Sequence, residues 1–171
     1  MLFRSGCAGG NGFDCLLDAG LDRVVGVDIN PRYIEEARQR YEGRIPGLDL
    51  RVADIQACMS LFEPVDFMYA ALLFEYVDLA RTMTVLRRHC KPNGVFAVLS
   101  QAPHETMAHV SPSPYTRLQL LEPIMRLVSQ EELQRHAMET GFMPQAASTI
   151  FSVAGKAFHV QEFRLHARGP V

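Results

Sequence analysis

The sequence predicts an α/β fold, with a mostly parallel β-sheet, helices on both faces and an antiparallel C-terminal hairpin. Between residues 24 and 99, short apolar runs alternate with segments of helical spacing, as in β-α-β units with right-handed crossovers. Two strand-like runs, residues 145–153 and 157–165, close the chain with Gly155-Lys156 between them as a turn. The length of 171 residues predicts one domain spanning residues 1–171.

The first half of the chain provides two strands and the helix between them. Residues 24–28 form a β-branched run that ends in an acid, and residues 49–54 form a weakly alternating run. Residues 31–41 read as a helix, because Asn30 can cap it and Pro31 suits the first turn.

The second half continues the alternation. Residues 66–73 and 95–99 are short and apolar, as buried parallel strands are. Apolar residues at helical spacing mark a helix over residues 79–90 between them. Ser129-Gln130-Glu131-Glu132 reads as a capping box that opens a last helix, ending near Gly141.

Charge, hydropathy and cysteine usage exclude several functional classes. The net charge of −2 and pI of about 6.3 provide no basic field for nucleic acid. The longest apolar run, residues 67–74, is far shorter than the ~20 residues of a membrane span. We expect no metal site, since Cys7, Cys15, Cys58 and Cys90 form no Cys-x-x-Cys pair. Reduced thiols and the lack of a leader predict a cytoplasmic protein.

A glycine-rich turn is the first motif with chemical meaning. Residues 6–12 hold four glycines, which lose much backbone entropy on folding. A tight strand-to-helix turn that lets a ligand approach the main chain accounts for them. The dinucleotide fingerprint Gly-x-Gly-x-x-Gly fails in both registers, since Ala8 or Cys15 occupies a required glycine position. The alternative is a flexible N-terminal turn.

Two acids follow, each at the predicted carboxyl end of a strand. Asp28 can accept hydrogen bonds from the two hydroxyls of a ribose, and its alternative role is to cap the next helix. Asp54 can accept from an adenine amino group while Ile55 packs on the ring, and its alternative is an ordinary loop-capping role. The order of glycine turn, acid and acid is more specific than any of the three alone.

These motifs resemble those of the class I S-adenosylmethionine-dependent methyltransferases of the small-molecule type, from Gly6 to about Gln101. The resemblance implies a Rossmann-like sheet of order 3-2-1-4-5-7-6 with strand 7 antiparallel, and S-adenosyl-L-methionine as cofactor. It assigns no oligomeric state. The positions that it implies for cofactor binding are Gly6, Cys7, Ala8, Gly10, Asp28, Ile29, Asp54, Ile55 and Ala70.

The N-terminus departs from the family pattern. Only residues 1–5 precede Gly6, which predicts a truncated or altered chain whose first five residues form a stub of the first strand. Arg4 stands where relatives often carry an acid that helps to hold the cationic methionine end of the cofactor. We therefore expect Arg4 to weaken that attraction.

The acceptor side is predicted to lie in residues 102–128, a proline-bearing insert that reads as a lid or substrate loop. His104, His109 and Tyr115 are its candidate catalytic or substrate-contacting residues. The sequence thus predicts transfer of a methyl group to a small-molecule acceptor. A non-catalytic relative that acts through a partner is the alternative, and a nucleotide-dependent oxidoreductase is a third reading.

Overall fold

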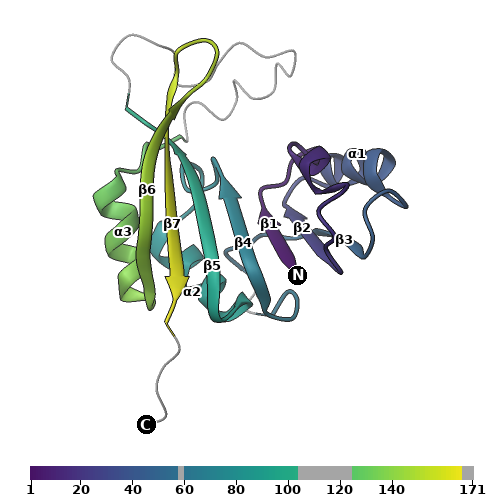
Figure 1. Cartoon of the computed structure of the whole chain (residues 1–171), viewed down its shortest axis with the longest axis horizontal. Helices are drawn as coiled ribbons and strands as arrows, with labels where there is room; N and C mark the ends of the chain where they lie inside the picture. The colour runs from purple at the N-terminus through teal and green to yellow at the C-terminus, as the bar shows by residue number, and fades with distance from the viewer. Residues whose placement is uncertain (58–59, 104–124, 167–171) are drawn as a thin grey trace.

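A seven-stranded sheet of order β3-β2-β1-β4-β5-β7-β6 organises the computed structural model, which describes residues 1–57, 60–103 and 125–166 (Figure 1). Strands β1 to β5 run parallel to one another, and β7 runs antiparallel to both β5 and β6. The predicted strand order and the antiparallel strand are therefore confirmed. The elements are β1 (Leu2–Ser5), the short 3₁₀ helix η1 (Phe13–Leu16), β2 (Val24–Asp28), α1 (Pro31–Tyr41), β3 (Leu48–Val52), β4 (Val65–Ala71), α2 (Leu79–His89), β5 (Cys90–Gln101), α3 (Gln130–Glu139), β6 (Phe142–Phe151) and β7 (Ala157–Leu165).

The short first strand occupies the middle of the sheet. Leu2 stands in register with Val24 of β2 on one side and Phe67 of β4 on the other. The expectation that residues 1–5 form part of the first strand is confirmed. Because alternate residues of a strand face opposite sides, Leu2 joins the core under α1 whereas Phe3 joins the core under α2 and α3.

Helices cover both faces, but over different strands. Ile34 and Tyr41 bring α1 against the core that lies under β2 and β1. On the other face, Leu86 of α2 and Leu133 of α3 pack on the core that includes Phe96 of β5. Figure 1 shows α2 and α3 together on one side of the sheet and α1 beside β1, β2 and β3.

The predicted helix caps are present. Asn30 precedes α1 and its side chain accepts a hydrogen bond from the Arg32 N–H at 3.0 Å, while Pro31 takes the first helical position. Ser129 Oγ likewise accepts from the Glu132 N–H at 3.1 Å at the start of α3. The Glu132 side chain pairs with Arg126 at 2.6 Å.

One strand is longer than the sequence predicted. The helix predicted over residues 79–90 and the strand predicted over residues 95–99 leave residues 91–94 as a connection, yet β5 begins at Cys90, immediately after α2. Cys90 stands opposite Val65 and Val95 opposite Phe67, so the register shifts and the intervening residues of β5 bulge. Asn93 takes a positive φ of 63° there, which accounts for the turn-like sequence.

Candidate functional site

The glycine-rich turn leaves the carboxyl end of β1 and folds back toward β2. The Cys7 N–H donates to Val27 O at 3.2 Å, and the Ala8 N–H donates to Asp28 Oδ2 at 2.9 Å. Gly6 has a φ of +62°, and a Cβ there would meet only Leu73 Cδ1, at 3.6 Å. The space beside the Gly6 main chain is therefore open apart from this one contact with Leu73.

Gly10 serves the packing of the turn itself. Its φ is +83°, and an added Cβ would lie 2.5 Å from a ring carbon of Tyr41 on α1. Its N–H donates to Cys7 O at 3.0 Å, so this group is already used within the turn. The glycine at this position lets the turn pack directly on the Tyr41 ring.

Asp28 ends β2 beside the turn. Its Oδ1 accepts from the Asn30 N–H and its Oδ2 from the Ala8 N–H, both at 2.9 Å. A carboxylate has about four lone-pair sites, so the two oxygens keep capacity for the hydroxyls of a ligand. The next side chain, Ile29, is 68% exposed, which offers an apolar surface beside the carboxylate. The helix cap is Asn30, so the alternative role of Asp28 as the cap of α1 does not apply.

Asp54 and Ile55 follow β3 but lie in different surroundings. The Ala53 N–H donates to Asp28 O at 3.0 Å, which ties the ends of β2 and β3 together. Asp54 Oδ1 accepts from the Gln56 N–H at 2.8 Å, the geometry of a loop-capping acid, and no described residue donates a hydrogen bond to Oδ2. Ile55 is 5% exposed and belongs to the core under α2, so little of its side chain is available to a ring.

Two further predicted positions are buried beside the turn. Ala70 of β4 stands in register with Ser5, and both side chains are almost fully buried. Burial raises the pKa of Cys7 to about 12, so its thiol is neutral and unreactive at physiological pH. Ala70 and Cys7 can therefore support the turn only through packing and through their backbone, because their side chains are buried.

Arg4 projects toward the same region from β1. Its guanidinium carbon lies 5.2 Å from the ring centroid of Tyr69 and 6.0 Å from that of Phe13. An added Cβ at Gly12 would lie 2.6 Å from Arg4 Nη1, so the cation sits against the turn. Its Nε is buried with no hydrogen-bond partner in the described part of the chain, and burial lowers the pKa of the Arg4 guanidinium.

Sequence reasoning missed a buried acid at the carboxyl edge. Glu75 is 1% exposed, and its Oε1 accepts from the Gln101 N–H at 2.7 Å at the end of β5. Glu75 Oε2 and Gln101 Nε2 are both buried, and neither has a hydrogen-bond partner among the described residues. Burial raises the pKa of the Glu75 carboxyl. The available signal was an acid inside the otherwise apolar stretch 67–77.

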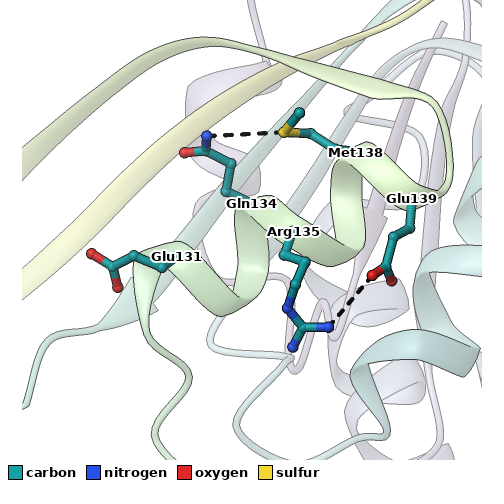
Figure 2. A pocket seen from close by; sticks show the side chains of 5 residues that line it. All are labelled: Glu131, Gln134, Arg135, Met138 and Glu139. Carbon is teal, nitrogen blue, oxygen red and sulfur yellow. Dashed lines mark hydrogen bonds and ion pairs between the residues drawn. The ribbon is translucent and has the colours of Figure 1, made fainter.

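The structure does not describe the residues predicted for the acceptor side. His104, His109 and Tyr115 lie outside the described residues, as does most of the insert 102–128. Figure 2 shows a shallow hollow whose side chains all come from α3, so no second element converges on it. Its lining residues are Glu131, Gln134, Arg135, Met138 and Glu139.

Two features are absent from the described part of the chain. Across residues 1–57, 60–103 and 125–166, no helix has the length and apolar character that crossing a membrane requires. Over the same ranges, no group of three or more His, Cys, Asp or Glu side chains is arranged to hold a metal ion.

Comparison with known proteins identifies the family. Solved structures with the same fold include the N-methyltransferase NodS from Bradyrhizobium japonicum bound to S-adenosylhomocysteine (18% identity, 96% of this chain and 76% of that chain, TM-score 0.72). Geranyl diphosphate C-methyltransferase from Streptomyces coelicolor is similar at 16% identity, with coverage of 96% and 70% and a TM-score of 0.73. Magnesium protoporphyrin IX methyltransferase from Synechocystis, with bound S-adenosylmethionine, is similar at 13% identity, with coverage of 98% and 70% and a TM-score of 0.71. No curated protein has a significantly similar sequence. Residues 3–98 match the family described as methyltransferase domain, so this chain belongs to that family and is an S-adenosylmethionine-dependent methyltransferase.

Proposed function

We propose that this methyltransferase transfers the methyl group of S-adenosylmethionine to a small-molecule acceptor in the cytoplasm. The observation that carries the proposal is the convergence of the turn at Gly6 with Asp28 and Asp54 at neighbouring strand ends. Both acids keep lone pairs that no described protein group uses.

The residues at this edge fit the nucleoside part of the cofactor. Asp28 would accept from the two ribose hydroxyls, and the exposed Ile29 would pack on the adenine ring. Asp54 would accept from the adenine amino group through Oδ2, to which no described residue donates. The bare backbone at Gly6 would let the cofactor approach the main chain.

The main contribution of the protein to methyl transfer would be to orient the methyl donor and the acceptor. S-adenosylmethionine, when bound, supplies a methyl group already activated on a sulfonium. Holding two reactants in line is worth up to ~7–11 kcal/mol of the barrier, so no catalytic side chain is obligatory. A general base is needed only where the acceptor must lose a proton, and His104, His109 and Tyr115 remain the predicted candidates.

The acceptor class and location rest on separate observations. A net charge of −2 provides no field for a nucleic acid, which favours a small acceptor. One of the structurally similar enzymes is named for geranyl diphosphate, itself a small acceptor. Among the described residues Cys7, Cys15 and Cys90 are free thiols, which supports a reducing compartment.

A non-catalytic relative is the second candidate, and Arg4 is the observation that favours it. Its cation sits against the turn, where the positively charged end of the cofactor would lie. Such a protein would bind the cofactor poorly and act through a partner.

Two measurements separate these candidates. Calorimetric titration with S-adenosylmethionine, S-adenosylhomocysteine and NAD should give micromolar binding of the first two compounds and none of NAD. Incubation with methyl-labelled cofactor and a protein-free metabolite extract should then move label into small molecules. Weak cofactor binding without label transfer to any extract would favour the non-catalytic protein. Absence of binding would refute the proposed site.

A further inference from the structure

Residues with a positive φ alternate along the glycine-rich turn, residues 6–12. They are Gly6, Ala8, Gly10 and Gly12. Glycine enters this region of φ easily but also leaves it easily, and Ala8 is strained there. A turn of this composition has many backbone conformations of similar energy. Contacts from other parts of the chain must therefore select the conformation that is observed.

The helix α1 supplies such contacts to the middle of the turn. Arg40 Nη1 donates to Gly9 O at 2.8 Å, across 31 residues of sequence. A Cβ on Gly9 would lie 2.9 Å from the carboxyl carbon of Glu36, which precedes Arg40 by one helical turn and shares its face of α1. In Figure 1, α1 lies next to the purple segment that follows β1. Glu36 and Arg40 thus both lie against the main chain at Gly9.

Arg40 also reaches the far end of the turn, through Tyr41. Arg40 Nη2 donates to Tyr41 Oη at 2.9 Å, and Tyr41 Oη donates to Asp14 Oδ2 of η1 at 3.0 Å. The Tyr41 side chain is fully buried, and its ring packs edge-on against Phe13 with 5.5 Å between the ring centroids. Both outer nitrogens of one planar guanidinium are therefore engaged, and they connect Gly9, α1 and η1.

We propose that Arg40 is a positioning residue for the cofactor, which holds the turn in the conformation that binds it. This inference rests on the proposed cofactor site. Asp28 holds the start of the turn through the Ala8 N–H, and the Arg40–Tyr41 pair holds Gly9 and Asp14. The apparent affinity of a ligand falls with the fraction of protein whose site is in the competent form. Arg40 therefore acts on cofactor affinity through the main chain of the turn.

Titration of the folded Arg40→Gln variant with S-adenosylhomocysteine and with S-adenosylmethionine tests the proposal. One hydrogen bond is worth about fivefold in an equilibrium constant, so both compounds should bind about fivefold more weakly. The two losses should be equal, because the same turn serves both compounds. A long-range effect of the lost positive charge would instead favour the cationic S-adenosylmethionine.

Arg38→Gln is the matched control. Arg38 lies on the same helix, has the same 42% side-chain exposure as Arg40 and forms an ion pair with Glu35 of α1 at 3.6 Å. The control removes the same charge from the same helix, and it should leave both dissociation constants unaltered. Weakening of the same size in Arg38→Gln would overturn the proposal.

Hydrogen exchange of the free protein separates positioning from a purely structural role. In Arg40→Gln, the amides of residues 8–14 should exchange faster than in the parent, while those of β5 keep their rates. Saturation with S-adenosylhomocysteine should restore the parent rates in the turn. Circular dichroism melting shows that each variant is folded at the temperature of the titrations. A lower melting temperature with unchanged dissociation constants would overturn the proposal.

The parent protein keeps the inference distinct from the proposed function. Failure of the parent to bind either compound would refute the proposed site, and the role of Arg40 with it. Binding by the parent that Arg40→Gln leaves unchanged refutes the role of Arg40 alone.

Discussion

Asp28 Oδ2 accepts a hydrogen bond from the Ala8 N–H at 2.9 Å, so the acid at the end of β2 holds the glycine-rich turn of β1. Its Oδ1 accepts from the Asn30 N–H at the entry to α1. One carboxylate thus joins the turn, the strand and the helix cap. A ligand held by Asp28 would therefore meet a carboxylate whose position is already fixed before binding.

Asp28→Ala should lower the affinity for S-adenosylhomocysteine at least tenfold. A charged acceptor that makes two hydrogen bonds is worth ~1.5–3 kcal/mol, and the turn also loses its tether at Ala8. Calorimetric titration of both proteins measures the change. Asp18→Ala removes an exposed acid after η1 and should leave the dissociation constant unaltered. An unchanged constant for Asp28→Ala would remove this residue from the site.

The sequence predicted the strands and helices of the sheet because these elements depend on local pattern. Apolar runs, the Asn30 and Ser129 caps and the acid at the end of β2 are each readable within a few residues. The alternation of strand and helix then leaves few possible topologies. The order of the strands itself came from the resemblance to the methyltransferase family, and the structure confirms it.

Contacts between residues that are far apart in the sequence could not be predicted from such local signals. Glu75 is buried because it meets the end of β5, 26 residues later, and no local signal encodes that contact. Gly10 was assigned to the ligand, yet the Tyr41 ring, 31 residues away, is what fills the space of its absent side chain. Ile55 likewise turned toward the core under α2. Tertiary packing decides each of these positions.

Gly10→Ala should destabilise the protein more than Gly20→Ala. Both glycines have positive φ, +83° and +61°, so each alanine costs about 1–2 kcal/mol in backbone strain. A Cβ at Gly20 meets nothing within 4 Å, whereas one at Gly10 would lie 2.5 Å from the Tyr41 ring. Overpacking adds ~1–3 kcal/mol at Gly10 alone. Urea unfolding gives the two free energies, and equal losses would show that the turn does not pack on Tyr41.

Arg4→Gln should strengthen binding of S-adenosylmethionine more than binding of S-adenosylhomocysteine. The two compounds differ by the positive charge of the sulfonium, which an adjacent guanidinium repels. At ~8 Å and an effective dielectric constant of ~40, this repulsion is about 1 kcal/mol, or roughly fivefold in affinity. Parallel titrations with both compounds give the ratio of dissociation constants. A ratio that Arg4→Gln leaves unaltered would mean that Arg4 faces away from the sulfonium.

Glu75→Gln should stabilise the protein at neutral pH. Burial raises the pKa of the Glu75 carboxyl above its ordinary value of 4.5, so the folded state binds this proton more tightly than the unfolded state. Stability from this group is therefore greatest below pH 4.5 and declines as the pH rises through the raised pKa. Glutamine keeps an oxygen for the Gln101 N–H and has no charge to bury.

The difference in unfolding free energy between Glu75→Gln and the parent, measured in urea from pH 4 to pH 8, isolates this one titration. It should grow in favour of the variant as the pH rises, and then level off once the parent carboxyl is ionised. Glu63→Gln changes an exposed acid and should give a flat difference over the same range. A flat or falling difference for Glu75→Gln would mean that the buried carboxylate is compensated in the folded protein. Its free Oε2 would then have a partner that the described residues do not contain.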